Sequence, residues 1–191
     1  MYSEITSALV SQVMPATPLA NITANLPAVL DALGAHQCDR AMLIMALATI
    51  RAEVATFTPL SEFQSSFNTP PGGPPFSLYD HRTDLGNQGP PDGQRFRGRG
   101  YVQLTGRANY QAFGPVVGVD LIANPDLASD PKTAASLLVA FLLRKKDQIH
   151  AAIASNDLMA ARRLVNGGTH GYDAFLDTFQ RASKLFPQIL T

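Results

Sequence analysis

The sequence predicts a mainly α-helical fold with at most a small β-hairpin, and three observations lead to this class. Residues 39–57 are apolar almost all the way round, which is typical of a helix buried inside a protein. Asp130 and Pro131 form a helix start signal, an N-cap side chain followed by proline at the first helical position. Helical periodicity covers most of the chain beyond residue 107, whereas strand patterns are short.

Taken in order, the elements divide into an N-terminal segment and one larger domain. Residues 1–34 hold two short amphipathic segments separated by a break at Met14-Pro15, and we expect this helical segment to pack on the domain formed by residues 35–191. In the larger domain, Asp39 is the expected N-cap of the buried helix. Further helices are expected at residues 107–117, 131–146, 147–155, 157–165 and 172–185. Short strands are expected at residues 76–79 and 100–104.

Residues 58–95 form a long irregular segment, rich in proline and glycine, that includes NTPPGGPP and GNQGPPDG. Irregular segments of this length inside compact domains are usually functional or disordered. Because this one precedes the polar motif discussed below, the functional interpretation is favoured. Its proline-containing turns restrict the backbone, so we expect a largely preformed wall of a binding site.

Composition excludes several classes of function. The chain has 191 residues and a formal net charge of zero, with 15 basic and 15 acidic residues. A nucleic-acid binder normally carries a basic excess, so none is expected here. No apolar run of 18 residues predicts a transmembrane helix. The four histidines are scattered without metal-ligand spacing, so neither a metal nor another cofactor is expected.

The single cysteine and the N-terminus bear on where the protein acts. Cys38 has no partner for an intrachain disulfide, and we expect it to be a small buried apolar residue. The first 20 residues lack a basic region and a long apolar core, so they make a poor signal peptide. Synthesis in the cytoplasm, with release or export by another route, is the expectation, and a monomer is expected.

Residues 96–110, FRGRGYVQLTGRANY, are the most informative stretch for function. Two glycines bracket an arginine, and short hydrogen-bonding side chains follow. Glycine allows close approach of a ligand to the backbone, and Gln, Thr, Asn and Tyr supply both donors and acceptors. Neutral hydrogen bonding beside an aromatic face suits a sugar ring, whereas the lysine and spacing of a phosphate-binding loop are absent.

This motif resembles the core signature of the family 19 glycoside hydrolases, which include chitinases and phage-type lysozymes. The resemblance extends over residues 40–170, through Gly118-Val119-Asp120-Leu121, Asn124-Pro125-Asp126-Leu127, Asp130-Pro131, Lys132-Thr133-Ala134 and Val165-Asn166-Gly167-Gly168. It implies a lysozyme-like, two-lobed helical fold with a cleft, and an inverting glycosidase. An inverting enzyme uses two carboxyl groups, an acid and a base that activates water, about 6.5–9.5 Å apart.

The resemblance implies that Glu53, near the end of the apolar helix, is the catalytic acid. Partial burial and the negative end of the helix dipole both disfavour a carboxylate, so a raised pKa is expected for this acid. The expected base is Glu62, nine residues later, with Asp80 as the alternative and Asp84 as a further rival. The short spacing differs from many plant chitinases and resembles the phage-lysozyme branch.

Several polar residues match family positions in the cleft. Thr105 matches the hydroxyl that positions the attacking water, although a backbone-bonded loop hydroxyl is its ordinary alternative. Two roles are expected for Arg99 as alternatives: pairing with a catalytic carboxylate, or a structural contact that ties its own loop to a helix. The expected substrate-binding residues are Arg99, Tyr101, Gln103, Asn109, Tyr110 and Asn166.

The function expected from these residues is inverting hydrolysis of β-1,4 bonds in an N-acetylglucosamine-containing cell-wall polymer. Small size, missing disulfides, the short acid-to-base spacing and the absence of tryptophan favour peptidoglycan, as for a lysozyme or endolysin. Chitin is the alternative substrate. A non-catalytic glycan-binding module on the same scaffold is a further alternative. The sequence leaves open whether a cognate immunity or inhibitor protein binds this chain.

Overall fold

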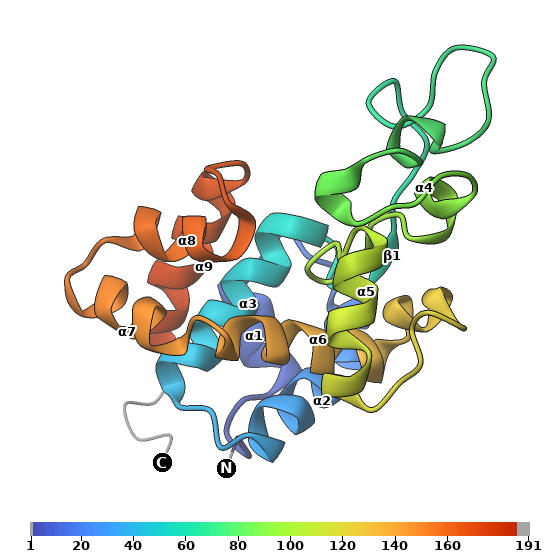
Figure 1. The fold of residues 1–191 in the computed structure, drawn as a ribbon. Coiled ribbons are helices and arrows are strands. Elements are labelled where there is room, and N and C mark those ends of the chain that lie inside the picture. The colour runs from blue at the N-terminus through green and yellow to red at the C-terminus, as the bar shows by residue number, and fades with distance from the viewer. Residues whose placement is uncertain (1, 187–191) are drawn as a thin grey trace. The chain divides into compact units, whose positions relative to one another are not determined.

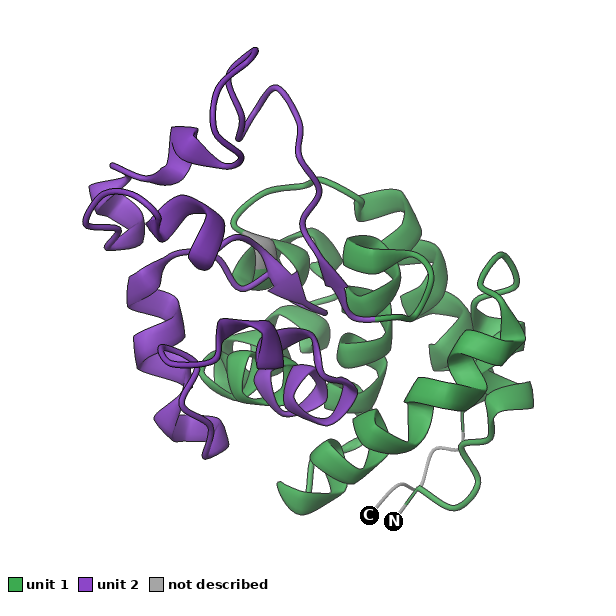
Figure 2. Ribbon diagram, turned by 90° about the vertical axis from the view of Figure 1, so that its right-hand side faces the viewer, with its two compact units in different colours: residues 1–58, 138–191 green, residues 59–137 purple. Residues whose placement is uncertain are grey.

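The computed structural model describes residues 2–186, with the backbone alone at Asn166. The chain divides into two compact units, which Figure 2 colours separately. Unit 1 comprises residues 1–58 and 138–191, and unit 2 comprises residues 59–137. Among the described residues, no helix combines the length and apolar character that a membrane span requires.

Unit 1 is helical and is built around α3 (Arg40–Val54), labelled in Figure 1. Every residue from Met42 to Ile50 is buried, as the sequence predicts for this helix. The Asp39 side chain accepts a hydrogen bond from the Met42 amide at 3.0 Å, which confirms the predicted N-cap. The helix ends at Val54, three residues earlier than predicted, because Ala55 has a φ of 40°.

Helices α2, α7 and α9 pack on α3. Helix α9 packs along it and also contacts α1 and α8, while α7 packs on α8. The N-terminal helices α1 and α2 lie on either side of the predicted break at Met14-Pro15. Cys38 is buried, as predicted. The bounds are α1 (Ser7–Val13), α2 (Leu19–Ala35), α7 (Lys146–Ala154), α8 (Leu158–Asn166) and α9 (Tyr172–Leu185).

Helix α6 (Pro131–Leu143) begins in unit 2 and ends in unit 1. Oδ1 of Asp130 accepts hydrogen bonds from the amides of Lys132 and Thr133, at 3.1 and 3.0 Å. These bonds confirm the predicted helix start at Asp130-Pro131. The helix ends at Leu143, slightly before the predicted end at residue 146.

Unit 2 is mostly short elements joined by ordered turns. A two-stranded antiparallel sheet pairs β1 (Leu60–Ser61) with β2 (Arg99–Gly100). The remaining elements are α4 (Asp92–Arg95), α5 (Arg107–Phe113) and four 3₁₀ helices, η1 (Ser77–Tyr79), η2 (Thr83–Leu85), η3 (Pro115–Val117) and η4 (Pro125–Ser129). Helix α5 with η3 covers the predicted 107–117.

The predicted strand at residues 76–79 is wrong, because this segment contains η1. Phe76 has a φ of 60°, in the left-handed region and far from the backbone angles of a regular strand. Pro74 and Pro75 precede it and have no amide hydrogen for a sheet. The second predicted strand is shorter and earlier than expected, since β2 is Arg99–Gly100 and Leu104 contributes only an isolated bridge to Arg99.

Buried polar side chains organise the long segment from residue 59 to 95. Asn87 donates to the Tyr79 carbonyl at 2.8 Å and accepts from the Arg107 amide at 2.9 Å. Arg107 also makes two hydrogen bonds to the buried Asp92, at 2.7 and 2.6 Å, which lower the pKa of that carboxyl. Hydrogen bonds within the segment and to Arg107 therefore hold it in place, consistent with a preformed wall.

Candidate functional site

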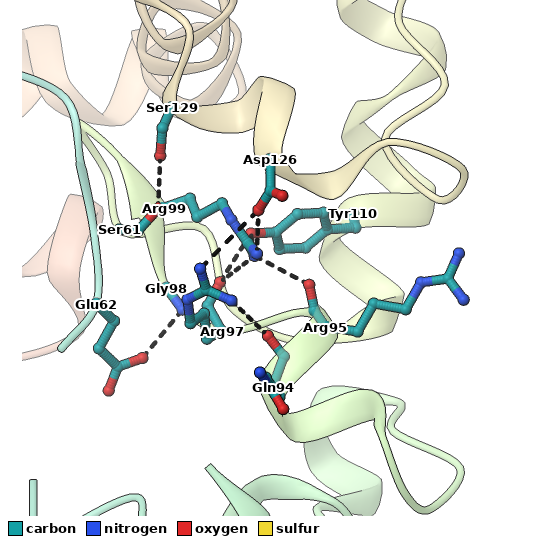
Figure 3. Close-up of polar contacts among 10 residues, drawn as sticks. All are labelled: Ser61, Glu62, Gln94, Arg95, Arg97, Gly98, Arg99, Tyr110, Asp126 and Ser129. Atoms are coloured by element: carbon teal, nitrogen blue, oxygen red, sulfur yellow. Dashed lines mark hydrogen bonds and ion pairs between the residues drawn. The ribbon is translucent and has the colours of Figure 1, made fainter. Parts of the chain in front are cut away.

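Glu62 directly follows β1, and hydrogen bonds within unit 2 hold both oxygens of its carboxylate. Oε1 accepts from Nδ2 of Asn68 and from the hydroxyl of Tyr79, each at 2.9 Å. Oε2 accepts from the amide of Gly98 at 3.0 Å, a contact drawn in Figure 3. The Glu62 amide in turn donates to the Gly98 carbonyl at 2.8 Å. The carboxylate is therefore fixed against the start of the FRGRGY motif.

Three of the predicted site residues converge on Gly98. A Cβ atom built on this glycine would lie 2.9 Å from Oε1 of Gln103, 3.1 Å from Oε2 of Glu62 and 3.2 Å from Oγ1 of Thr105. Gln103 reaches this position with a φ of 49°, and its Nε2 donates to the carbonyls of Leu60 and Gly100. The structure thus brings the predicted base together with Thr105, the predicted water-positioning residue. The Thr105 hydroxyl also donates to the Gln103 carbonyl at 2.8 Å, which is the backbone bond of its ordinary alternative.

This convergence gives Gly98 a testable role. Gly98→Ala places a methyl group where Glu62, Gln103 and Thr105 now meet, so these side chains must shift to make room for it. Misplacement of a reacting group by about 1 Å can cost about a hundredfold in rate, so we expect kcat to fall by about tenfold or more. The melting temperature of the variant should stay close to that of the wild type.

The matched control is Gly34→Ala in α2, where no atom lies closer than 3.9 Å to the added Cβ. Hydrolysis rates of an N-acetylglucosamine oligomer provide the measurement. Wild-type kcat in Gly98→Ala would show that the convergence around this glycine does not matter for turnover.

Asp80, the alternative base, occupies a structural position instead. Its side chain is buried, and Oδ1 accepts from the Gly93 amide at 2.8 Å. Asp84 is exposed and pairs with Arg82 at 2.6 Å. Neither carboxylate joins the group around Gly98, which supports Glu62 over both.

Arg99 and Tyr110 form a buried network beside the site (Figure 3). One terminal nitrogen of Arg99 donates to the Tyr110 hydroxyl at 2.9 Å and to the carbonyls of Arg95 and Arg97. The other pairs with Asp126 at 2.6 Å, although the Asp126 side chain is 83% exposed. These contacts support the structural alternative for Arg99, which ties the loop to α5 and η4.

Tyr101 is likewise buried, with the pKa of its phenol raised by burial. Burial also raises the pKa of Tyr110 to about 12. Gln103, Thr105 and Asn109 are only half-buried, and Asn109 donates to the Thr105 carbonyl at 2.7 Å. Gln103, Asn109 and the predicted catalytic residue Thr105 are therefore more accessible than the predicted binding residues Arg99, Tyr101 and Tyr110.

Glu53 lies in unit 1, in the last turn of α3 as predicted. Its side chain is 15% exposed and forms a 2.8 Å ion pair with Arg162 of α8, which is fully buried. Arg162 also donates to the His170 carbonyl at 2.7 and 3.2 Å. The loop before α9 comes close to α3 here, since a Cβ on Gly171 would lie 2.9 Å from the Ala52 carbonyl oxygen.

Asn166 is the last residue of α8, and Gly167 follows in the left-handed conformation of a helix C-cap. The backbone of the Asn-Gly-Gly motif therefore ends helix α8. The side chain of Asn166 lies outside the described residues.

Three residues that the sequence did not single out contact the predicted carboxylates. Asn68 and Tyr79 bind Glu62, and Arg162 pairs with Glu53. Nothing in the sequence distinguished Arg162 from other helical arginines, or Asn68 from other polar loop residues. Among residues 2–186, no three acidic, imidazole or thiol side chains gather in a way that could hold a metal ion.

Comparisons with known proteins agree with the motifs. The family profile described as chitinase class I, glycoside hydrolase family 19, matches residues 80–177. Rice chitinase 11 is 37% identical over 89 residues, which cover 45% of this chain and 33% of the rice protein. A glycosyl hydrolase family 19 domain-containing protein of Haemophilus influenzae is 30% identical over 96 residues, 50% of this chain and 45% of that protein. The alignments thus span less than half the length of these curated relatives.

Solved structures agree on the fold. Chitinase C from Streptomyces griseus matches with a TM-score of 0.63 and 21% identity, covering 95% of this chain and 76% of that chain. A bacterial family 19 chitinase matches with a TM-score of 0.64 and 22% identity, and the match covers 95% of this chain and 94% of that chain. These likenesses confirm the mainly helical, lysozyme-like fold class. With the family profile over half of the sequence and the ordered motifs within it, the chain belongs to glycoside hydrolase family 19.

Proposed function

We propose that the protein is an inverting glycosidase that hydrolyses β-1,4 bonds between N-acetylglucosamine units, with chitin as its first candidate substrate. The observation that carries the proposal is the convergence of Glu62, Thr105 and Gln103 around Gly98. A carboxylate held beside a hydroxyl is the arrangement needed to orient and deprotonate a water molecule.

The proposed mechanism uses two carboxyl groups. Glu53 donates a proton to the leaving glycosidic oxygen, and Glu62 takes a proton from the water that attacks the anomeric carbon. Gln103, Asn109 and Asn166 are the proposed partners for the hydroxyl and acetamido groups of the sugar. A non-catalytic glycan-binding module would need neither carboxyl group, and retention of both favours an enzyme.

The comparisons reverse the order of substrates that the sequence favoured. The named plant relatives are chitinases, as are the solved structures of similar fold, which supports chitin over peptidoglycan. Peptidoglycan stays the second candidate, because the chain contains no tryptophan and its more accessible site residues are amides and a hydroxyl. Such a site suits a glycan that carries bulky substituents on alternate sugars.

We therefore expect release of short sugars from an N-acetylglucosamine hexamer to exceed solubilisation of purified Gram-negative sacculi at equal enzyme concentration. Product masses identify the bond that is cut in each substrate. The Glu62→Gln variant, prepared in parallel, controls for contaminating hydrolases. Lysis of sacculi by a preparation that leaves the hexamer intact would restore peptidoglycan as the substrate. Inertness toward both, with binding retained, would support the glycan-binding module.

A further inference from the structure

The two oxygens of the Glu62 carboxylate are not equivalent. A carboxylate oxygen has two lone-pair sites for hydrogen bonds. Both sites of Oε1 are occupied, by Nδ2 of Asn68 and the Tyr79 hydroxyl. Among the described residues, Oε2 accepts one bond, from the Gly98 amide, and one site is left. Oε2 is also the oxygen beside the Cβ position at Gly98 that Thr105 and Gln103 approach.

Asn68 is built into the loop so that its amide must face Glu62. Its side chain is fully buried, and Oδ1 accepts from the Ser65 amide at 2.9 Å and from the Thr69 hydroxyl at 2.8 Å. With Oδ1 committed to the loop, Nδ2 is directed to Glu62 and to the Phe63 carbonyl, each at 2.9 Å. A flip of the amide would break all four contacts.

Tyr79 is held in its donating form. Burial and the neighbouring Glu62 raise the pKa of its phenol to about 12, so the hydroxyl keeps its proton throughout the range in which enzymes of this kind work. Its carbonyl accepts from Asn87, which anchors the end of η1. The donor therefore approaches Oε1 from a fixed element.

We infer that Asn68 and Tyr79 are positioning residues that saturate Oε1 of Glu62 and so make Oε2 the oxygen that receives the proton of the attacking water. The water O–H bond breaks, the proton joins Oε2, and the water oxygen forms the new bond to the anomeric carbon. The glycosidic C–O bond breaks at the same time, and the leaving oxygen takes the proton of Glu53. Thr105 lies on the Oε2 side, where it can hold the same water. This inference rests on the proposed function of Glu62 as the base.

The test is Tyr79→Phe, which removes one donor to Oε1 and keeps the ring. Tyr79 donates to a charged group, and such hydrogen bonds are among the stronger ones in proteins, so we expect kcat on the N-acetylglucosamine hexamer to fall about tenfold, with KM within about twofold of wild type. Tyr172→Phe in α9 is the matched control, a half-buried tyrosine of unit 1, and should leave kcat unchanged.

A double-mutant cycle separates positioning of the base from a merely structural effect. In a Glu62→Gln background, Tyr79→Phe should cause no further loss, because the base on which it acts is gone. An unchanged kcat in the single variant, or the same tenfold loss in both backgrounds, overturns the inference. Inactivity of the wild-type protein would overturn the proposed function as well, so the two failures are distinguishable.

Discussion

Replacement of Glu53 by glutamine should abolish most of the hydrolysis while the protein stays folded. Glutamine has the same shape but cannot give a proton to the leaving oxygen, and general acid catalysis contributes about a hundredfold to ten-thousandfold. Initial rates on the N-acetylglucosamine hexamer measure the loss. Glu4→Gln, an exposed glutamate in the same unit, is the control and should be fully active.

The ion pair between Glu53 and Arg162 affects the stability of the Glu53→Gln variant. Removing one partner of a buried pair costs about 3–5 kcal/mol, because the other charge is left without compensation. The glutamine oxygen still accepts a hydrogen bond from Arg162, so the melting temperature should fall less in Glu53→Gln than in Glu53→Ala. Activity above about a tenth of wild type in Glu53→Gln would remove Glu53 from the acid role.

Glu62→Gln is expected to be similarly inactive, and the stereochemistry of the wild-type product tests the same assignment. If Glu62 activates water on the face opposite the leaving group, the first product has the α-configuration. NMR of the anomeric protons during the first minutes of hydrolysis, before mutarotation, detects it. Early formation of the β-anomer would contradict an inverting mechanism.

Asp80→Asn distinguishes the two carboxylates proposed for the base. Asp80 accepts from the Gly93 amide, and asparagine retains an oxygen that can do the same. We expect a modest loss of stability and at most a small change in kcat, far from the effect of Glu62→Gln. The reverse result, an active Glu62→Gln and an inactive Asp80→Asn, would move the base to Asp80.

The local signals in the sequence were sufficient for most of the helices. The Asp39 cap, the apolar run of α3 and the Asp130-Pro131 start act over a few residues, so their outcome can be predicted without tertiary contacts. The strand predicted at residues 76–79 was wrong, because the two prolines before it and the left-handed Phe76 favour a turn of 3₁₀ helix.

The sequence by itself determined the family, the helical class and the residues able to do the chemistry, because motif order and residue type are properties of the chain. Only the tertiary structure decided which of those residues meet. Glu62 reaches Gly98 across 36 positions through the pairing of β1 with β2, and Asp80 turns inward to the Gly93 amide. Asn68, Tyr79 and Arg162 carry no local signal, since a hydrogen bond or ion pair between distant segments depends on how the backbone folds and not on sequence spacing.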